Sequence, residues 1–312
     1  MKTDPHILNG LEPDNLLAVL ALLGFVRAVH HAEPAWQLRV WWAGKPLRPR
    51  ARAVVAVTQE QLTEAAARGC QILAQVHDFG THLNLDYDPT EARDLLHSAS
   101  LDALPDSRQR IDLLASLMSD GAIKEDPKGD RVRPTPYCLL FGQGHQHFLE
   151  RLAAVPQGTL PKELAKLKSP PDLNSPSKIG EALFTPWDRT DATQSFRWDP
   201  LEDRRYALRF EDPSTDKGLT VHGANRLAAL ALPLLTAVPV KQRTEYRLAA
   251  IGTSSGKRGV VTVRWPIWDQ PASLDAIVAL WATRRGPAYT AERISVGKFF
   301  SFTRGSVAET SG

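Results

Sequence analysis

The longest apolar stretch lies near the start of the chain and predicts a buried helix. Leu16 to Val29 is almost entirely apolar, and Leu16, Leu20 and Leu23 recur at helical spacing. The opposite side of this helix is nearly as apolar, which favours packing on more than one side. Arg27 interrupts the stretch, which is also too short to span a bilayer, so we expect no membrane segment.

The residues that follow predict two strands and a second helix. Trp36 to Trp42 alternates between apolar and polar positions as a strand does, and a second strand is expected within Arg50 to Val57. Thr58 and Gln61 have the spacing of a capping box. We therefore expect a helix from this point to about Gln75.

Weaker patterns cover the rest of the chain. Pro156 to Pro176 is rich in Pro, Lys and Ser and is the best candidate for a linker or mobile loop. Pro233 interrupts an apolar helix expected over Ala224 to Val238. Further helices are predicted near Thr90–His97, Ser107–Ser119, His145–Val155 and Ser273–Thr283, and further strands near Arg205–Phe210, Gly218–Val221, Tyr246–Ile251, Val260–Trp265 and Ile294–Phe302.

These elements predict an α+β fold, with mixed helices and short antiparallel sheets and no regular βαβ alternation. We expect a mainly helical α+β region over 1–155, a Pro-, Lys- and Ser-rich linker or mobile loop over 156–195, and a basic α+β region over 196–312. The chain has 312 residues and is 43% hydrophobic, which suffices for a substantial core.

The net charge of +3 conceals an uneven distribution. Val54 to Asp130 holds 14 acidic and 6 basic residues, whereas Lys241 to Arg304 holds 11 basic and 4 acidic residues. Arg39 to Arg52 holds five basic residues and no acidic one. Such asymmetry suggests a polyanion held at a basic face, although ordinary solvated faces explain it equally well.

Several basic residues stand beside aromatic residues or glycines, as nucleic-acid-binding residues often do. Arg39 is close to Trp41 and Trp42, and Lys257-Arg258 lies in a glycine-flanked loop expected between two strands. Core tryptophans with charged neighbours, or tryptophans at protein–protein contacts, are the alternatives. The candidate phosphate-binding residues are Arg48, Arg50, Arg52, Arg204, Arg205, Lys257, Arg258 and Lys298.

The segment Val221 to Arg226 leads into a predicted helix. Backbone N–H groups at a helix start attract phosphate, and Asn and Arg are the side chains that most often contact adenine and guanine edges. Asn225 and Arg226 are therefore the candidates for base-edge contacts. A capping segment with a solvated arginine explains the same residues.

Few residues indicate catalysis, a metal or a cofactor. His77-Asp78 with His82 nearby suggests a metal hydrolase of the HD type, but Gly80 and Pro89 make this stretch a loop. Two cysteines, Cys70 and Cys138, form neither a disulfide framework nor a zinc cluster. The chain contains no Walker loop or nucleophile elbow, and we predict a non-enzyme without metal or cofactor.

Three blocks together resemble a subunit of type I-G CRISPR systems, formerly called type I-U. They are Leu8 to Asn15, Phe196 to Pro200 with Asp203 to Tyr206, and Thr220 to Leu227. The best resemblance is to the large subunit of the Cascade effector, the eighth Cas-protein family. The chain departs from many large subunits because it is short and its C-terminal part does not predict a helical bundle.

The resemblance implies a non-catalytic cytoplasmic subunit that contacts guide RNA, target double-stranded DNA and the adjacent PAM. Its protein partners would be the Cascade backbone subunits and the helicase–nuclease. An HD-type nuclease or phosphohydrolase and a pure protein-docking scaffold are the alternatives, the latter using the acidic segment. We expect Lys257→Ala with Arg258→Ala to weaken target binding and flatten its salt dependence.

Overall fold

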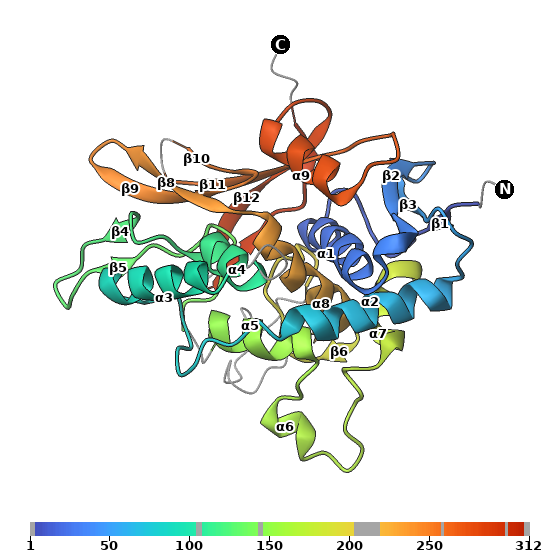
Figure 1. Cartoon of the computed structure of the whole chain (residues 1–312), viewed down its shortest axis with the longest axis horizontal. Helices are drawn as coiled ribbons and strands as arrows, with labels where there is room; N and C mark the ends of the chain where they lie inside the picture. Colours follow the sequence, from blue (N-terminus) through green and yellow to red (C-terminus); the bar gives the residue numbers. More distant parts are fainter. Residues whose placement is uncertain are drawn as a thin grey trace.

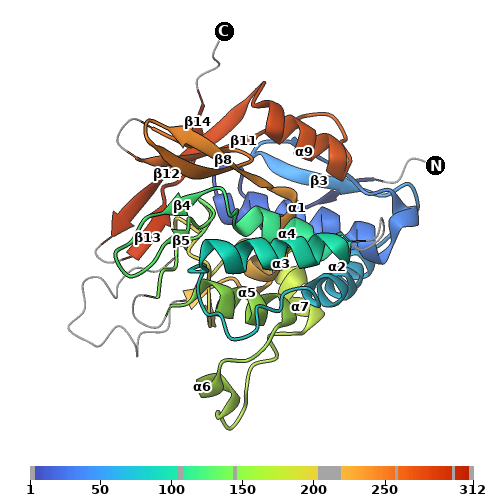
Figure 2. The same cartoon turned by 60° about the vertical axis from the view of Figure 1, so that its left-hand side comes forward.

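The computed structural model describes residues 4–103, 108–142, 146–202, 219–256, 259–296 and 299–308. Helix α1 (Leu16–Ala32) lies at the centre, and its residues from Leu16 to Val29 are all buried. The C-terminal strands lie on one side of α1, and helices α2 (Gln59–Ala74), α5 (Phe148–Gln157) and α7 (Pro176–Phe184) lie on the other (Figures 1 and 2). The predicted helix that packs on more than one side is confirmed.

Two close helix crossings organise this core. Helix α1 packs against α8 (His222–Ala231) and α2 (Gln59–Ala74). A Cβ atom on Gly24 would lie 1.7 Å from the carbonyl oxygen of Leu227, and one on Gly69 would lie 2.1 Å from that of Ala28. Glycine is therefore required at both crossings, because any side chain would push the helices apart.

Capping residues explain where the first two long helices begin. The Asn15 side chain accepts hydrogen bonds from the amides of Leu17 and Ala18 at the start of α1. Thr58 and Gln61 form the predicted capping box of α2. The other helices are α3 (Pro89–Leu101), α4 (Gln109–Leu117), α5 (Phe148–Gln157), α6 (Lys162–Ala165), α7 (Pro176–Phe184) and α9 (Leu274–Thr283), with 3-10 turns at Pro34–Trp36 and Leu232–Leu234.

Every strand pairing among the described residues is antiparallel, and the fold class is α+β as predicted. An N-terminal sheet has the order β1-β3-β2, and a C-terminal sheet has the order β10-β11-β12-β13 with β14 beside β12. The pairs β4-β5, β6-β7 and β8-β9 complete the set. The strands are β1 (His6–Ile7), β2 (Arg39–Ala43), β3 (Arg48–Arg52), β4 (Ile123–Lys124), β5 (Arg131–Val132), β6 (Asp191–Ala192), β7 (Leu219–Thr220), β8 (Ala237–Gln242), β9 (Glu245–Ala250), β10 (Thr253–Ser255), β11 (Val261–Pro266), β12 (Ala288–Val296), β13 (Phe299–Phe302) and β14 (Ser306–Val307).

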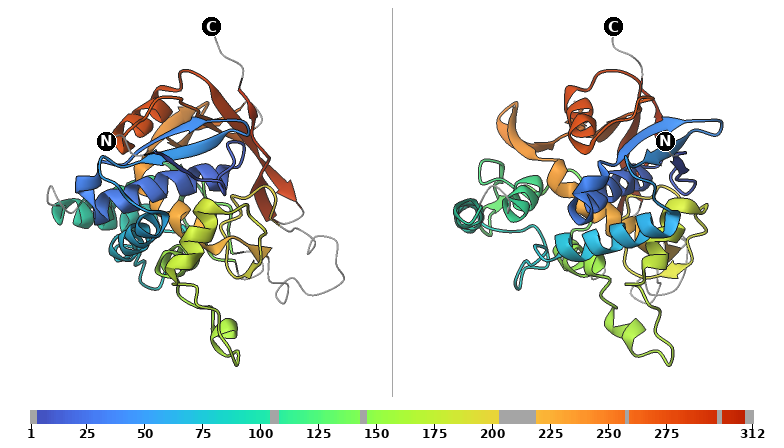
Figure 3. Two further views of the ribbon diagram at one scale, coloured as in Figure 1. Left: turned by 90° about the vertical axis from the view of Figure 1, so that its right-hand side faces the viewer. Right: turned by 45° about the vertical axis from the view of Figure 1, so that its right-hand side comes forward.

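The three predicted regions do not have separate cores. One hydrophobic cluster contains residues from Leu8 to Phe302. Within 156–195, helix α7 buries Ile179, Ala182 and Leu183, so this segment is not a linker throughout. Only its first part, around α6, projects from the body (Figures 1 and 3).

Two predicted elements end differently in the structure. The helix expected over 224–238 stops at Ala231, because Pro233 forces a 3-10 turn before strand β8. The strand expected over 294–302 is two paired strands, β12 and β13. The strand expected over 205–210 lies outside the described residues. Among the helices in the described ranges, none has both the length and the apolar character needed to cross a membrane.

Candidate nucleic-acid interface

Strand β3 carries three of the predicted arginines on one face. Side chains alternate between the two sides of a strand, and Pro49 and Ala51 are buried here. Arg48, Arg50 and Arg52, which alternate with them, remain partly exposed. The structure therefore brings these three side chains together on the outer side of the N-terminal sheet.

Strand β2 adds a fourth arginine and a tryptophan to the same side. Arg39 pairs with Arg52 across the sheet, and Trp41 pairs with Arg50. The guanidinium carbon of Arg52 lies 5.4 Å from the centroid of the partly exposed Trp41 ring, which is a cation–π distance. We call this surface the arginine face: Arg39, Arg48, Arg50, Arg52 and Trp41.

The arginines of this face differ in how far their charge is neutralised. Arg48 donates to the carbonyl oxygens of Asn9 and Leu47 and forms an ion pair with Glu12 at 3.4 Å. Within the described ranges, no carboxylate lies at ion-pair distance from Arg39, Arg50 or Arg52. Three positive charges therefore stand close together, and within the described part of the chain none of them is paired with a carboxylate.

The sheet beneath the arginine face is held at its β2 edge. Val40 and Ala272 exchange backbone hydrogen bonds of 3.1 and 3.0 Å, and the amide of Trp42 donates to the carbonyl of Trp268. The indole of Trp268 donates in turn to the carbonyl of Val40 at 2.7 Å. This edge is already paired, so a ligand meets the face of the sheet rather than its edge.

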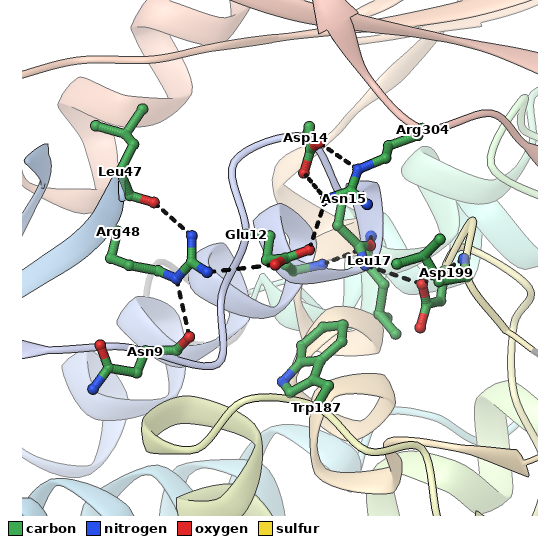
Figure 4. A network of polar contacts seen from close by, with 12 residues as sticks. Asn9, Glu12, Asp14, Asn15, Leu17, Leu47, Arg48, Trp187, Asp199 and Arg304 are labelled. Carbon is green, nitrogen blue, oxygen red and sulfur yellow. Dashed lines mark hydrogen bonds and ion pairs between the residues drawn. The ribbon is translucent and has the colours of Figure 1, made fainter. Parts of the chain in front are cut away.

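An ion-pair network adjoins the Arg48 end of the face (Figure 4). Glu12 lies between two arginines, with one oxygen 3.4 Å from Arg48 and the other 3.0 Å from Arg304. Arg304 also bonds Asp14, and that hydrogen bond raises the pKa of Arg304. The network joins the segment before α1 to the end of the C-terminal sheet.

The described parts of the three sequence blocks that carry the family resemblance meet behind this network. Asn15 donates to Asp199 at 3.0 Å, and Arg189 donates to the other oxygen of Asp199 at 2.7 Å. The amide of Phe196 donates to the side chain of Asn225 at 3.1 Å. Asp199 and the two asparagines are buried, so these residues connect α1, the 196–200 segment and α8 from the inside.

The prediction that Asn225 contacts a base edge is wrong. Its side chain is 1% exposed and donates to the Thr220 hydroxyl and the Val221 carbonyl, both at 3.0 Å. The start of α8 is equally inaccessible to phosphate. The amide of His222 donates to the carboxylate of Asp191 at 2.9 Å, so a side chain of the protein already occupies this helix N-terminus.

The same prediction is wrong for Arg226, which is fully buried. Its guanidinium donates to the carbonyl oxygens of Pro156, Leu173 and Asn174 and, at 2.7 Å, to the Asn174 side chain. Burial lowers its pKa. Arg226 therefore holds together the two ends of the projecting segment that contains α6, and it has no surface from which to contact a polynucleotide.

The other predicted site residues lie outside the described residues. They are Arg204, Arg205, Lys257, Arg258 and Lys298. Three residues around the candidate interface were not among the predicted site residues, namely Arg39, Arg189 and Arg304. The neighbouring Trp41 was a signal for Arg39, but no local pattern pointed to Arg304, whose partner Asp14 is 290 positions away.

The residues of the predicted metal alternative do not meet. His77 is buried and its Nδ1 atom bonds the carbonyl of Leu152, while Asp78 accepts the amide of Gly80. His82 instead lies 2.8 Å from Glu91. The described ranges contain no group of three or more metal-ligating side chains. No observation favours an HD-type site here.

Most tryptophans belong to the core rather than to an interaction surface. Trp36, Trp41 and Trp187 are partly exposed. The buried ones are Trp42, Trp198, Trp265, Trp268 and Trp281. The protein-docking alternative therefore cannot rest on the tryptophan count.

No protein-family model matches the chain, and a search of curated proteins finds no match.

Proposed function

We propose that this chain is a non-catalytic, cytoplasmic subunit of a type I CRISPR Cascade complex, most similar to its large subunit. In this proposal, the arginine face binds phosphates of the guide RNA or of the target double-stranded DNA beside the PAM. The Cascade backbone subunits and the helicase–nuclease are the protein partners. The observation that carries the proposal is the set of three uncompensated arginines on one sheet face.

The geometry of the face suits a sugar–phosphate chain. Arg50 and Arg52 are two residues apart on one strand, which separates their Cα atoms by about 7 Å, and Arg39 lies directly opposite Arg52. Guanidinium groups bind phosphate oxygens through paired N–H donors. A row of such groups can follow successive phosphates without selecting a sequence.

The family resemblance supports the assignment of the complex. The described parts of its blocks lie far apart in the sequence but are linked inside the protein by the Asn15–Asp199 and Phe196–Asn225 hydrogen bonds. Their roles are structural, which fits a subunit that carries no catalytic residue. The charge of the arginine face supplies an independent reason to expect nucleic acid as the ligand.

A charge-removal variant tests nucleic-acid binding directly. We expect Arg39→Ala with Arg50→Ala and Arg52→Ala to weaken binding to a guide RNA–target DNA duplex at least about tenfold at low salt. Fluorescence anisotropy measures the affinity. The matched control is Arg93→Ala, which removes an exposed arginine paired with Asp120 on the acidic side. Equal affinities of the triple variant and the control would contradict the proposal.

Assembly tests the second part of the proposal. Co-expression with a CRISPR array and the backbone genes found beside it is expected to yield a complex that contains this chain and guide RNA. If the other subunits assemble on guide RNA while this chain purifies alone, the assignment to Cascade fails.

A further inference from the structure

A cavity of about 170 Å³ lies where the arginine face ends. Arg48, the first residue of β3, forms part of the cavity wall. Arg304 and Glu12 contribute further polar wall, and Trp187 and Leu201 contribute apolar wall. Figure 4 shows Glu12 between Arg48 and Arg304, with Trp187 beside this row of contacts. A strand that follows Arg52, Arg50 and Arg48 therefore arrives at this cavity.

The cavity and the arginine face differ in how far their arginines are neutralised by carboxylates. Arg48 is paired with Glu12, Arg304 with Glu12 and Asp14, and Arg189 with Asp199. Three guanidinium groups thus face three carboxylates, whereas Arg39, Arg50 and Arg52 on the neighbouring face have no carboxylate partner among the described residues. A phosphate gains most on the face, and the cavity favours an uncharged group with donors and acceptors on its edge.

Internal hydrogen bonds fix the walls of the cavity. The Trp187 indole donates to the carbonyl of Ala182 at 2.8 Å, and Arg189 donates to the carbonyl of Trp187 at 3.2 Å. The guanidinium carbon of Arg189 lies 5.8 Å from the centroid of the Trp187 ring. A site with an aromatic wall, arginine donors and a carboxylate acceptor is chemically matched to a planar heteroaromatic ring.

We propose that this cavity holds one unpaired nucleobase of the strand whose phosphates lie along the arginine face. The inference rests on the proposed function and narrows it to single-stranded nucleic acid, because a base inside a duplex is stacked on its neighbours and paired through its Watson–Crick edge, so it cannot enter a cavity. Glu12 accepts from base N–H groups, such as the N3–H of thymine, and Arg48 or Arg304 donates to base carbonyl oxygens.

The test compares two chains with the same phosphates. One is an oligothymidylate of about 12 nucleotides, and the other is an abasic chain of equal length. We expect the protein to bind the base-bearing chain about 5- to 100-fold more tightly. Leu201→Met and Asn9→Met place longer side chains without an aromatic ring at exposed positions of the cavity wall. Both are expected to reduce this preference while the affinity for the abasic chain stays unchanged.

The outcomes separate this inference from the proposed function. The triple arginine variant is expected to weaken both chains equally and to keep the preference for bases. Equal binding of both chains by the unmodified protein would overturn the cavity assignment alone, as would a preference that neither methionine variant reduces. If the unmodified protein binds the guide RNA–target DNA duplex but neither single-stranded chain, the inference fails and the proposed function stands. If it binds none of the three ligands, both fail.

Discussion

The arginine face and the buried arginines near α8 place the same side chain in opposite surroundings. On the face, Arg50 and Arg52 stand beside Arg39 without a carboxylate partner in the described ranges. In the core, Arg226 is surrounded by three backbone carbonyls and an amide oxygen, and Arg27 donates to the carbonyl of Leu230 at 2.7 Å. The face keeps its charge available for a ligand, and the core uses its guanidinium groups as internal cross-links.

The difference shows what a buried arginine needs. Removing a guanidinium from water is costly unless its N–H donors are satisfied, and burial lowers the pKa of Arg27 to about 10. Carbonyl oxygens at the ends of segments supply the acceptors. On β3, successive side chains point to opposite faces of the sheet, so the arginine side chains reach solvent. Water can then accept from their N–H groups, and no protein carbonyl is needed.

The largest expected effect is acid sensitivity of the core. Burial lowers the pKa of His77 to about 3 and that of His222 to about 4, with further lowering from Arg27 and Arg226 respectively. Below about pH 6.5, His77 and His222 therefore bind protons in the unfolded chain but stay neutral in the folded protein. Stability is expected to fall by roughly 1.4 kcal/mol per pH unit for each histidine between about pH 6 and 4.

Urea unfolding across this pH range measures the effect. The slope of the unfolding free energy against pH reports how many more protons the unfolded state binds than the folded state. His77→Leu is expected to lower this number by about one. His97→Leu, at an exposed position, is the control and is expected to leave the slope unchanged. A His77→Leu variant with the unmodified slope would show that His77 is protonated in the folded protein.

The next effect is the loss of the internal cross-link made by Arg226. Arg226→Met leaves the carbonyls of Pro156, Leu173 and Asn174 without their donor and is expected to cost about 3–5 kcal/mol of unfolding free energy. The projecting segment around α6 should then be cut faster by protease. Arg68→Met, at an exposed ion pair with Glu33, should change stability by less than about 1 kcal/mol. If Arg226→Met left stability unchanged but weakened nucleic-acid binding, Arg226 would contact the nucleic acid and would not be an internal cross-link.

The smallest effect concerns the kind of positive charge on the arginine face. Arg50→Lys with Arg52→Lys keeps the charge but loses the paired donors, and it is expected to weaken nucleic-acid binding about two- to fivefold. The salt dependence should stay the same, because the number of phosphates neutralised does not change. A loss as large as that of the alanine variants would mean that donor geometry, and not charge, governs binding.

Local patterns predicted much of the fold. The apolar run after Asn15 and the Thr58–Gln61 capping box identified α1 and α2 with their first residues. The basic run from Arg39 to Arg52 drew attention to the arginines that the structure places on the arginine face, although the second strand begins at Arg48 and not within the predicted range of Arg50 to Val57. Each of these features depends on neighbours within a few residues.

The remainder depended on partners distant in the sequence. Arg226 looked like a solvated residue in a helix start, but the carbonyls that bury it come from residues 52 to 70 positions earlier. Asp191 occupies the N-terminus of α8 from 31 positions away. The cavity wall includes an ion pair between Glu12 and Arg304, which lie 292 positions apart in the sequence. No local spacing contains these contacts.

The most direct test is the salt dependence of nucleic-acid affinity for the unmodified protein and the triple variant of Arg39, Arg50 and Arg52. Each phosphate neutralised contributes about 0.7 to 0.9 to the slope of log affinity against log salt. We predict that the triple variant lowers the magnitude of this slope by about 2 to 3, while Arg93→Ala leaves it unchanged. Parallel lines for the triple variant and the unmodified protein would show that the arginine face does not contact phosphates.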